Sequence, residues 1–362
     1  MNSNTFVQKD AELKDLIEIL TWCRGAGTQS ERDFVAQHIA TIPNIWPDQY
    51  GNYHLTIGEN PTVLWSSHTD TVTRKEGRQN VKWVSKGVLG LNNGQQGQCL
   101  GADDGAGVWL MMELIKAQKP GHYVFHRDEE IGGLGSTWIS KNSYVLPDSI
   151  RCAIAMDRCD TRDVITHQGF SRCASDQFAK SLCRQLPAGM VPDDTGVFTD
   201  TANYVDLIDE CTNLSVGYQR NHGKDETLDT VFLRELRDCL LKLDYSKLEF
   251  SRKAGDMEYV DYYGHSAYYG GGKHTYSGDT TGAAYTGNFP WDDDNDDDRY
   301  AEYMRHDVDR SPLSSGGGTS ASMREIVEEA PEIAARLLEE LGVSTDEMRA
   351  HVFALTGRMV GV

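Results

Sequence analysis

The sequence contains few of the features that mark membrane, secreted or nucleic-acid-binding proteins. No apolar run approaches the ~18 residues of a membrane span, and the first residues lead into a charged amphipathic stretch that does not resemble a signal peptide. We therefore expect a cytoplasmic protein that does not enter a membrane. Basic residues are outnumbered, with 35 Lys and Arg against 55 Asp and Glu and a formal charge of −20. Nucleic-acid binding requires a basic surface, so this class is excluded.

Cysteine motifs are also missing. The eight cysteines are irregularly spaced, and no two of them form a CxxC pair. Zinc-finger sites use such pairs, so none is expected, and the thiols are expected to be reduced. The Gly-x-Ser-x-Gly elbow of many serine hydrolases is absent as well. The chemistry must therefore be sought among histidines and carboxylates.

Alternating helix and strand patterns over residues 11–243 predict an α/β fold. Apolar residues recur with helical spacing at 11–23, 105–116 and 228–243, and residues 28–31 form a capping box that opens another helix. Short apolar strands are predicted at 53–57, 62–66, 123–125, 153–156 and 214–216, and a helix at 204–208. Strands that alternate with helices predict a mainly parallel sheet sandwiched by helices.

The composition changes beyond about residue 250, so we predict three parts. Residues 1–247 would form the main domain. Residues 248–318, rich in Gly, Tyr and Asp, are predicted to be a flexible linker because they hold too little apolar surface to order themselves. Residues 319–362 contain two capping boxes and are predicted to form a small helical segment. Such a segment has too little core to be stable alone, so it would dock on the main domain, a second copy or another protein.

Histidines and acids gather in five short segments that close or follow predicted strands. They are Ser-His-Thr-Asp at 67–70, Gly-Ala-Asp-Asp-Gly at 101–105, Asp-Glu-Glu at 128–130, Met-Asp-Arg at 156–158 and Arg-Asn-His at 220–222. Active sites of such sheets lie beyond the carboxyl ends of the strands, so the five segments are expected to form one site. Two histidines and several carboxylates suit a pair of zinc-like ions.

The first two segments offer a histidine and a bridging acid. His68 can bind a metal ion through one ring nitrogen while Asp70 accepts a hydrogen bond from the other. Asp103 lies in a glycine-flanked turn, and its two carboxylate oxygens can bridge two ions. The alternative for Asp103 or Asp104 is a helix N-cap.

Glu129 and Glu130 form the most diagnostic pair. Neighbouring residues in a loop can point one carboxylate at a metal ion and the other at a water molecule bound to it. Coordination lowers the pKa of that water, and the second carboxylate takes its proton and delivers it to the leaving amine. A pair of surface glutamates is the alternative, but the glycine-rich turn at 132–136 favours a specialised loop.

The last two segments offer the remaining ligands. Asp157 follows an apolar strand and could complete the coordination of one ion, with Asp160 as a nearby competitor. His222, just past a predicted strand, could complete the coordination of the second ion. His126 and His167 are rival histidines, but His126 lies within a strand before the acids, where a packed or supporting role is expected.

With these residues in this order, the sequence resembles the co-catalytic zinc exopeptidase superfamily over about residues 10–245. That superfamily includes bacterial leucyl aminopeptidases, tripeptidase T, glutamyl aminopeptidases and the glutamate carboxypeptidase or aminoacylase branch. The resemblance implies one metal ion held by His68, Asp103 and Asp157, and a second held by Asp103, Glu130 and His222. It also implies Glu129 as the general base, Asp70 as the support of His68, and a cis peptide between Asp103 and Asp104.

Segment spacing indicates the branch. About 65 residues separate Asp157 from His222, too few for the lid domain of the carboxypeptidase and aminoacylase branch. The roughly 35 residues between His68 and Asp103 are too few for the extra domain of the glutamyl aminopeptidases. The chain therefore resembles the compact aminopeptidase branch without a lid domain.

The expected function is that of a dinuclear metal exopeptidase, an aminopeptidase acting on short peptides. Zinc is the default ion, and manganese or cobalt would serve the same ligands. A carboxypeptidase or amide deacylase on the same fold is the alternative, and a non-catalytic binding scaffold is a third hypothesis. The residues that choose the substrate would lie on loops such as 199–201. Expected partners are a peptide and, through the C-terminal helical segment, a second copy of the chain or another protein.

Overall fold

The computed structural model describes residues 12–92, 98–169, 171–260 and 266–269. The predicted linker from residue 270 onward and the predicted helical segment at 319–362 lie outside these ranges. Of the helices within the described ranges, none combines the length and apolarity that a membrane crossing requires.

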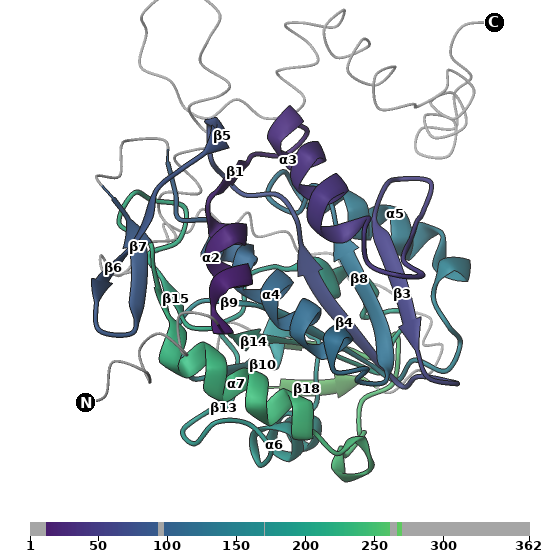
Figure 1. Cartoon of the computed structure of the whole chain (residues 1–362). Helices are drawn as coiled ribbons and strands as arrows, with labels where there is room; N and C mark the ends of the chain where they lie inside the picture. The colour runs from purple at the N-terminus through teal and green to yellow at the C-terminus, as the bar shows by residue number, and fades with distance from the viewer. Residues whose placement is uncertain (1–11, 93–97, 170, 261–265, 270–362) are drawn as a thin grey trace, which may run out of the picture. The chain divides into compact units, whose positions relative to one another are not determined.

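An eight-stranded mixed sheet lies at the centre of the described structure (Figure 1). Its strands follow the order β13-β10-β14-β9-β4-β8-β3-β2. In that order their bounds are Val191–Asp193, Asp163–Ile165, Glu210–Ser215, Cys152–Arg158, Val63–His68, Gly121–His126, Tyr53–Ile57 and Trp46–Pro47. The four strands from β14 to β8 pair in parallel, whereas β3 and β2 are antiparallel at one edge. The predicted parallel sheet is thus confirmed at its centre.

Side chains of the central strands alternate between two hydrophobic clusters, one on each face of the sheet. Val63 and Trp65 of β4 belong to the larger cluster, and Leu64 between them belongs to the smaller. This alternation follows from the extended backbone, which points successive side chains to opposite faces. Because both faces are covered, β4, β8 and β14 are buried along their whole length rather than at every second residue.

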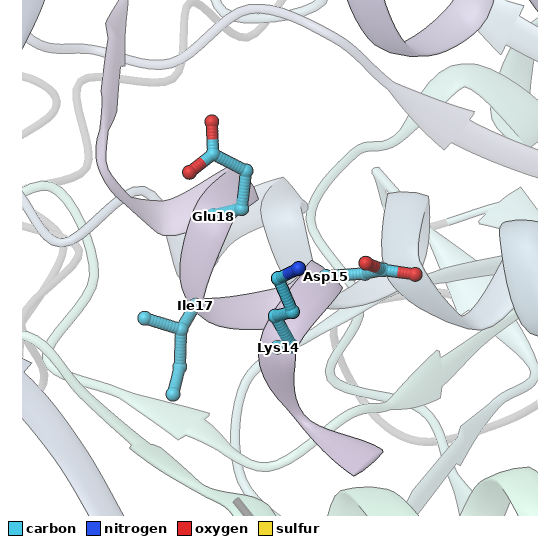
Figure 2. Close-up of a pocket in the computed structure, with 4 residues that line it drawn as sticks. All are labelled: Lys14, Asp15, Ile17 and Glu18. Atoms are coloured by element: carbon cyan, nitrogen blue, oxygen red, sulfur yellow. The ribbon is translucent and has the colours of Figure 1, made fainter. Parts of the chain in front are cut away.

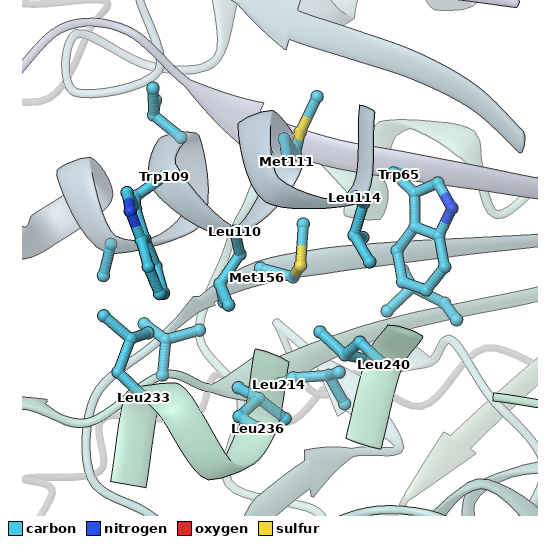
Figure 3. Close-up of a cluster of buried hydrophobic side chains, with 14 of the residues drawn as sticks. Trp65, Trp109, Leu110, Met111, Leu114, Met156, Leu214, Leu233, Leu236 and Leu240 are labelled. Carbon is cyan, nitrogen blue, oxygen red and sulfur yellow. The ribbon is translucent and has the colours of Figure 1, made fainter. Parts of the chain in front are cut away.

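Helices cover both faces. The larger cluster is formed with α2 (Lys14–Leu20), α4 (Ala102–Lys116) and α7 (Thr230–Lys242), and the smaller with α5 (Leu134–Lys141) and the 3-10 helix η3 (Asp200–Tyr204). Figure 3 shows leucines of α4 and α7 facing one another across Met156 of β9. Each fully buried leucine stabilises the fold by about 1.5–3 kcal/mol.

The helix predicted at 28–31 begins as expected, but the capping box is incomplete because the Glu31 carboxylate accepts the N–H of Gly27 instead of that of Thr28. The Thr28 hydroxyl accepts the N–H of Glu31 at 3.2 Å, and α3 (Gln29–Phe34) continues as a π-helix at Val35–Ile39. Such a cap pairs an N–H that the first turn would leave without a partner.

Two predicted helices differ from the structure. The one at 11–23 ends at Leu20, because Trp22–Arg24 forms strand β1 and pairs with β5 (Glu76–Arg78). In place of the helix predicted at 204–208, the structure has η3 at Asp200–Tyr204. The helix does not continue, because the N–H groups of Leu207 and Ile208 both bond to the Tyr204 carbonyl and close a turn. At Trp22–Arg24 pairing with a distant strand decides the local conformation.

The remaining elements form smaller sheets and short helices. One four-stranded sheet joins β15 (Tyr218–Gln219), β16 (Thr227–Asp229), β7 (Val88–Leu91) and β6 (Val81–Ser85). Another joins β11 (His167–Gln168), β12 (Ser171–Arg172), β17 (Met257–Val260) and β18 (Ser266–Tyr269). The short helices are α6 (Asp176–Cys183), η2 (Ser143–Val145) and η4 (Tyr245–Lys247).

Packing continues past residue 247, where the predicted linker begins. Glu210 of β14 accepts the N–H groups of Ser251 and Arg252 at 2.8 and 2.9 Å. The buried Arg252 guanidinium donates to the carbonyl oxygens of Val205 and Asp209 at 2.7 and 2.8 Å. These bonds pair groups that burial would otherwise leave unsatisfied. The packed part of the main domain therefore extends beyond the boundary drawn from the sequence.

Candidate metal centre

Four predicted site residues lie at the carboxyl ends of parallel strands. His68 is the last residue of β4, Glu129 and Glu130 lie in the loop after β8, and Asp157 is the penultimate residue of β9. Because β4, β8 and β9 are parallel neighbours, their carboxyl ends meet at one edge of the sheet. The sheet therefore brings together residues that are nearly 90 positions apart in the sequence.

Asp103 comes instead from the start of α4. Gly101, with a φ of 71°, turns the chain into this helix in a conformation that favours glycine, and the Asp103–Asp104 peptide is cis. The Asp104 carboxylate accepts the hydroxyl of Ser67 at 2.6 Å and the N–H of Gly107 at 2.9 Å. Asp104 thus caps the helix and ties it to β4, while the Asp103 side chain faces the site.

Asp103 lies between two histidines. Its Oδ1 is 3.1 Å from Nε2 of His68, and its Oδ2 is 3.0 Å from Nε2 of His222. His68 Nε2 lies 3.5 Å from Oδ1 of Asp157, and His222 Nε2 lies 3.3 Å from Oε2 of Glu130. Both histidines thus lie next to Asp103, and each also lies next to one further acid. This gives two groups of three donor residues, and within each group the ligand atoms lie within 4.8 Å of one another. These groups contain the same residues that the family resemblance implies for the two ions.

This donor set fits divalent cations. It gathers several carboxylates at a buried position, where their negative charges are unfavourable unless cations balance them. Burial raises the pKa of Glu130 to about 7 and also raises the pKa of Asp157. Oε1 of Glu130 is buried and makes no hydrogen bond. Burial opposes protonation of His68 and His222, but nearby carboxylates outweigh it and raise the pKa of both rings well above the usual value. Bound cations would stabilise the anions and leave both rings as neutral ligands.

Glu129 lies beside the first group without belonging to either. Its Oε2 is 3.9 Å from Nε2 of His68. Burial raises the pKa of its carboxyl well above the usual value, with the neighbouring Asp157 contributing in the same direction. A carboxylate with increased proton affinity beside a candidate metal centre is suited to general base catalysis.

Asp70 contacts the Glu pair as well as His68. Nδ1 of His68 lies 3.1 Å from the main-chain oxygen of Asp70 and 3.6 Å from its carboxylate. That carboxylate accepts the N–H of Glu129 at 3.2 Å and the N–H of Glu130 at 3.1 Å. The main chain of Asp70 therefore makes the shorter contact with the His68 ring, and its side chain fixes the loop that carries the two glutamates.

Other buried and partly buried groups hold the same loop. Arg127 donates two hydrogen bonds of 2.8 Å to Glu31, and the hydroxyl of Tyr50 donates to Asp128 at 2.6 Å. Asn52 accepts the N–H of Arg127 at 3.1 Å. Paired, charge-assisted contacts of this kind restrict the loop and therefore the directions of Glu129 and Glu130.

Asp157 is oriented by three polar neighbours. The hydroxyl of Thr199 donates to its Oδ2 at 2.8 Å and the hydroxyl of Tyr218 to its Oδ1 at 3.2 Å, while Asn213 accepts its N–H at 2.9 Å. Residues 199–201, which the sequence analysis placed on a loop and associated with substrate choice, form the start of η3, and Thr199 contacts a candidate ligand.

The rival residues lie outside both donor groups of the described structure. The buried His126 pairs with the Tyr204 hydroxyl at 2.6 Å, with Asp200 at 3.3 Å, and burial lowers its pKa to about 3. His126 is therefore a neutral packed residue, in line with the expectation. Neither His167 nor Asp160 joins the two donor groups.

Two buried charges next to the site had no sequence signal. The carboxylate of Glu226 accepts the N–H groups of Gly101, Ala102 and Asp103 at 2.9, 2.9 and 3.0 Å. Burial, with Asp103 nearby, raises the pKa of Glu226 to about 7. Arg24 donates to the Gly101 carbonyl at 3.0 Å. Glu226 stands in a polar turn and Arg24 after a predicted helix, so no motif or periodicity distinguishes them from surface charges.

A pocket on helix α2 is unrelated to these residues. It is lined by Lys14, Asp15, Ile17 and Glu18 (Figure 2). None of the four belongs to a donor group, and charged side chains on an exposed helix are ordinary surface features. We assign no function to this pocket.

Comparison with known proteins shows similarity in structure only. No protein-family profile and no curated protein matches the sequence. Among solved structures, a tripeptidase of Staphylococcus aureus is similar with a TM-score of 0.54 and 14% identity, covering 64% of this chain and 96% of the tripeptidase. An aminopeptidase PepT of Bacillus cereus gives a TM-score of 0.51 at 12% identity over 63% of this chain and 96% of its own.

A third similar structure is the TET1 peptidase of Pyrococcus horikoshii, which can assemble into a tetrahedron or a large octahedral shell. It gives a TM-score of 0.50 at 15% identity and covers 63% of this chain and 98% of its own. At these identities the similarities establish a shared fold. The predicted resemblance to the exopeptidase superfamily is thereby confirmed in fold, whereas the compact branch without a lid domain stays a prediction.

Proposed function

We propose that this protein is a metal-dependent exopeptidase, specifically an aminopeptidase that acts on short peptides. One observation carries the proposal: the two oxygens of Asp103 face two separate donor groups, each completed by one histidine and one further acid. A carboxylate shared in this way is the arrangement that co-catalytic metal sites use. The fold, which is that of peptidases, supports the same assignment.

Two divalent ions, zinc by default and manganese or cobalt as alternatives, would be held by these groups. His68, Asp103 and Asp157 would hold one ion, and Asp103, Glu130 and His222 the other. When bound, the ions would act as Lewis acids that polarise a scissile carbonyl and make a water molecule more acidic. Mixed imidazole and carboxylate ligands suit all three of these metals.

Glu129 would move the proton. Its carboxylate, 3.9 Å from His68, would accept a proton from the attacking water molecule and donate it to the nitrogen of the leaving amine. The hydrogen bond from its own N–H to Asp70 fixes the loop on which this transfer depends. Asp70 would therefore position Glu129 and orient His68 at the same time.

Charge favours the amino end of a peptide. Two divalent ions would balance the acids of the centre itself, so the preference rests on the chain as a whole, which carries a formal charge of −20. A free α-amino group is a cation and would be attracted to such a site. A terminal carboxylate would be repelled by the same excess of negative charge.

The test uses short peptides free at both ends, with amino-acetylated and carboxy-amidated copies as matched controls. Purified protein would be incubated with zinc, cobalt or manganese, beside a chelated sample, and the products identified by mass spectrometry. Stepwise loss from the amino end, abolished by chelation and by acetylation, is the expected result. Loss from the carboxyl end, abolished by amidation, would assign a carboxypeptidase instead. Release of the acetyl group would indicate a deacylase, and no cleavage with metal bound would favour a binding scaffold.

We also propose that the chain associates with itself. The TET1 peptidase of similar fold forms closed assemblies, which makes self-association a reasonable expectation for this chain. Light scattering of the full-length protein after size-exclusion chromatography would give its mass directly. A mass of a single chain, 40.4 kDa, would contradict the proposal.

A further inference from the structure

Glu226 anchors the turn that carries Asp103. One of its oxygens accepts the N–H groups of Ala102 and Asp103, and the other accepts the N–H of Gly101. The Glu226 side chain is fully enclosed, and its residue is 1% exposed. Hydrogen bonds from backbone N–H groups to a buried carboxylate are charge-assisted and among the stronger contacts of a protein. The turn before α4 therefore depends on one side chain that lies 123 residues further along the chain.

Arg24 holds the same turn from its other side. Its Nη2 donates to the Gly101 carbonyl at 3.0 Å, and its guanidinium carbon lies 4.6 Å from the centre of the Phe34 ring. Arg24 is completely buried. The peptide groups of Gly101 are thus paired with a buried anion through N–H and with a buried cation through C=O, which leaves little freedom for the turn.

The direction of the Asp103 carboxylate matters because its two oxygens have different partners. Oδ1 faces His68, whereas Oδ2 faces His222 and accepts a hydrogen bond from Asn221 at 2.8 Å. A rotation that shortens one contact lengthens the other. Since Glu226 binds the N–H of Asp103 itself, it fixes the backbone from which that carboxylate projects.

Glu226 also belongs to the segment that supplies His222. Its N–H donates to the carbonyl of Gly223 at 3.2 Å and closes a turn between the two residues. The histidine of the second donor group and the anchor of the shared acid therefore lie in one short hydrogen-bonded segment, residues 222–226. A displacement of this turn would affect both donor groups at once.

We propose that Glu226 is the positioning residue that sets the geometry of Asp103 for both metal ions, with Arg24 as its counterpart across the turn. This inference rests on the proposed function, because it assigns Glu226 a part in metal binding. Residues that form hydrogen bonds with a metal ligand and so orient it typically contribute 10- to 100-fold to metal affinity or activity. Loss of Glu226 should therefore weaken both sites together rather than one of them.

The experiment compares Glu226→Gln and Glu226→Ala with the wild-type chain. In Glu226→Gln one oxygen becomes an NH₂ group, which is a donor. It cannot accept a hydrogen bond from the backbone N–H that it faces. Metal-free proteins would be titrated with zinc by calorimetry and, for tight sites, by competition with a chromophoric chelator. We expect both sites to weaken by about 10- to 100-fold in Glu226→Gln, and further in Glu226→Ala.

Glu210→Gln is the matched control. Glu210 is a fully buried acid that likewise accepts three backbone N–H groups, from Ser175, Ser251 and Arg252. It is the first residue of β14, at the end of the strand away from the candidate site. A merely structural role would lower the thermal stability of Glu210→Gln and Glu226→Gln alike and leave metal affinity unchanged in both.

The outcomes separate the two proposals. Weakened zinc binding in Glu226→Gln, with wild-type affinity in Glu210→Gln, supports the positioning role. Wild-type affinity in a folded Glu226→Gln overturns it, while two-site binding by the wild type leaves the metal centre intact. A wild-type chain that binds no zinc, cobalt or manganese overturns the proposed function and this inference together. A wild-type chain that binds two ions but cleaves no peptide overturns the proposed function alone.

Discussion

The carboxylate of Asp70 lies closer to the backbone of Glu129 than to the ring of His68. Its Oδ1 is 3.2 Å from the Glu129 nitrogen and 3.6 Å from Nδ1 of His68. The parallel pairing of β4 with β8 produces this contact. It places Asp70, two residues beyond the end of β4, beside the loop that follows β8. One acid thus links a candidate metal ligand to the candidate general base.

Asp70→Asn should reduce turnover more than metal binding. The amide retains one acceptor oxygen but presents NH₂ to one of the two loop N–H groups, so Glu129 loses its fixed direction. We expect kcat to fall by about 10- to 100-fold, with both ions still bound at saturation. Peptide cleavage under saturating zinc and metal analysis of the same sample would check this. The exposed Asp15→Asn serves as control, and a variant that keeps full kcat would contradict the prediction.

Glu129→Gln should separate catalysis from metal binding. Glutamine has nearly the same shape but cannot accept a proton, and Glu129 belongs to neither donor group. We expect a loss of at least about 10²-fold in kcat with unchanged metal content. Steady-state kinetics and elemental analysis give both quantities.

The matched control for this change is Glu235→Gln, on the exposed side of α7. It should be indistinguishable from the wild type. Loss of metal from Glu129→Gln would mean that this carboxylate is a ligand and that the assignment of Glu129 and Glu130 must be exchanged.

Single ligand substitutions should differ in how many ions they remove. Asp157→Ala and His222→Ala each remove a donor from one group, whereas Asp103→Ala removes a donor from both. We therefore expect one tightly bound ion in the first two variants and none in the third. Metal analysis after dialysis against metal-free buffer would count the ions. Retention of two ions by Asp103→Ala would exclude a shared carboxylate.

The candidate site could be predicted largely from the sequence because its residues are chemically distinctive and follow strands. His68 and Asp157 end apolar runs, and parallel strands place such ends at one edge of a sheet. The acids after β8 stand next to a glycine-rich turn, which is itself a recognisable signal. Local pattern and topology thus agree for these segments.

The supports of the site could not be predicted in the same way. Glu226 and Arg24 support the site because folding brings both of them, from distant positions in the sequence, to the turn at Gly101. No motif or periodicity in the neighbouring sequence distinguishes either residue. The strand Trp22–Arg24 could likewise not be predicted, because the helical spacing of apolar residues extends into it. Its pairing partner, β5, lies more than fifty positions away in the sequence. Non-local pairing decides such cases, and a single sequence does not display it.

The core between α4 and α7 should be sensitive to truncation. Leu110 is fully buried in the larger cluster, where it faces the leucines of α7 (Figure 3). Leu110→Ala removes buried apolar volume and leaves a cavity, so we expect a loss of about 2–5 kcal/mol in the free energy of unfolding. Denaturant unfolding of the metal-free protein measures it. Val231→Ala, at a position 54% exposed, should change stability by less than about 0.5 kcal/mol.

The stability of the metal-free protein should fall as pH rises from about 5 to 8. Glu130 and Glu226 have pKa values raised to about 7 from the usual 4.5, so between these values the folded state holds protons that the unfolded state has released. Stability decreases with pH wherever the folded state binds more protons. His68 and His222, whose pKa values are also raised, act in the same direction as pH passes above 6.5. His126, whose pKa burial lowers to about 3, opposes the trend only below pH 6.5.

Bound metal should reverse this trend, because ions displace the same protons and bind more tightly as pH rises. Thermal melts at pH 5.5, 7.0 and 8.5 would be recorded with chelator and with saturating zinc. We expect Tm to fall with pH in the first series, and the zinc-induced increase in Tm to grow with pH. Glu130→Gln should flatten the chelated series, since it removes one of the titrating groups. A chelated Tm that rises between pH 5.5 and 8.5 would show that these acids are already ionised in the metal-free protein.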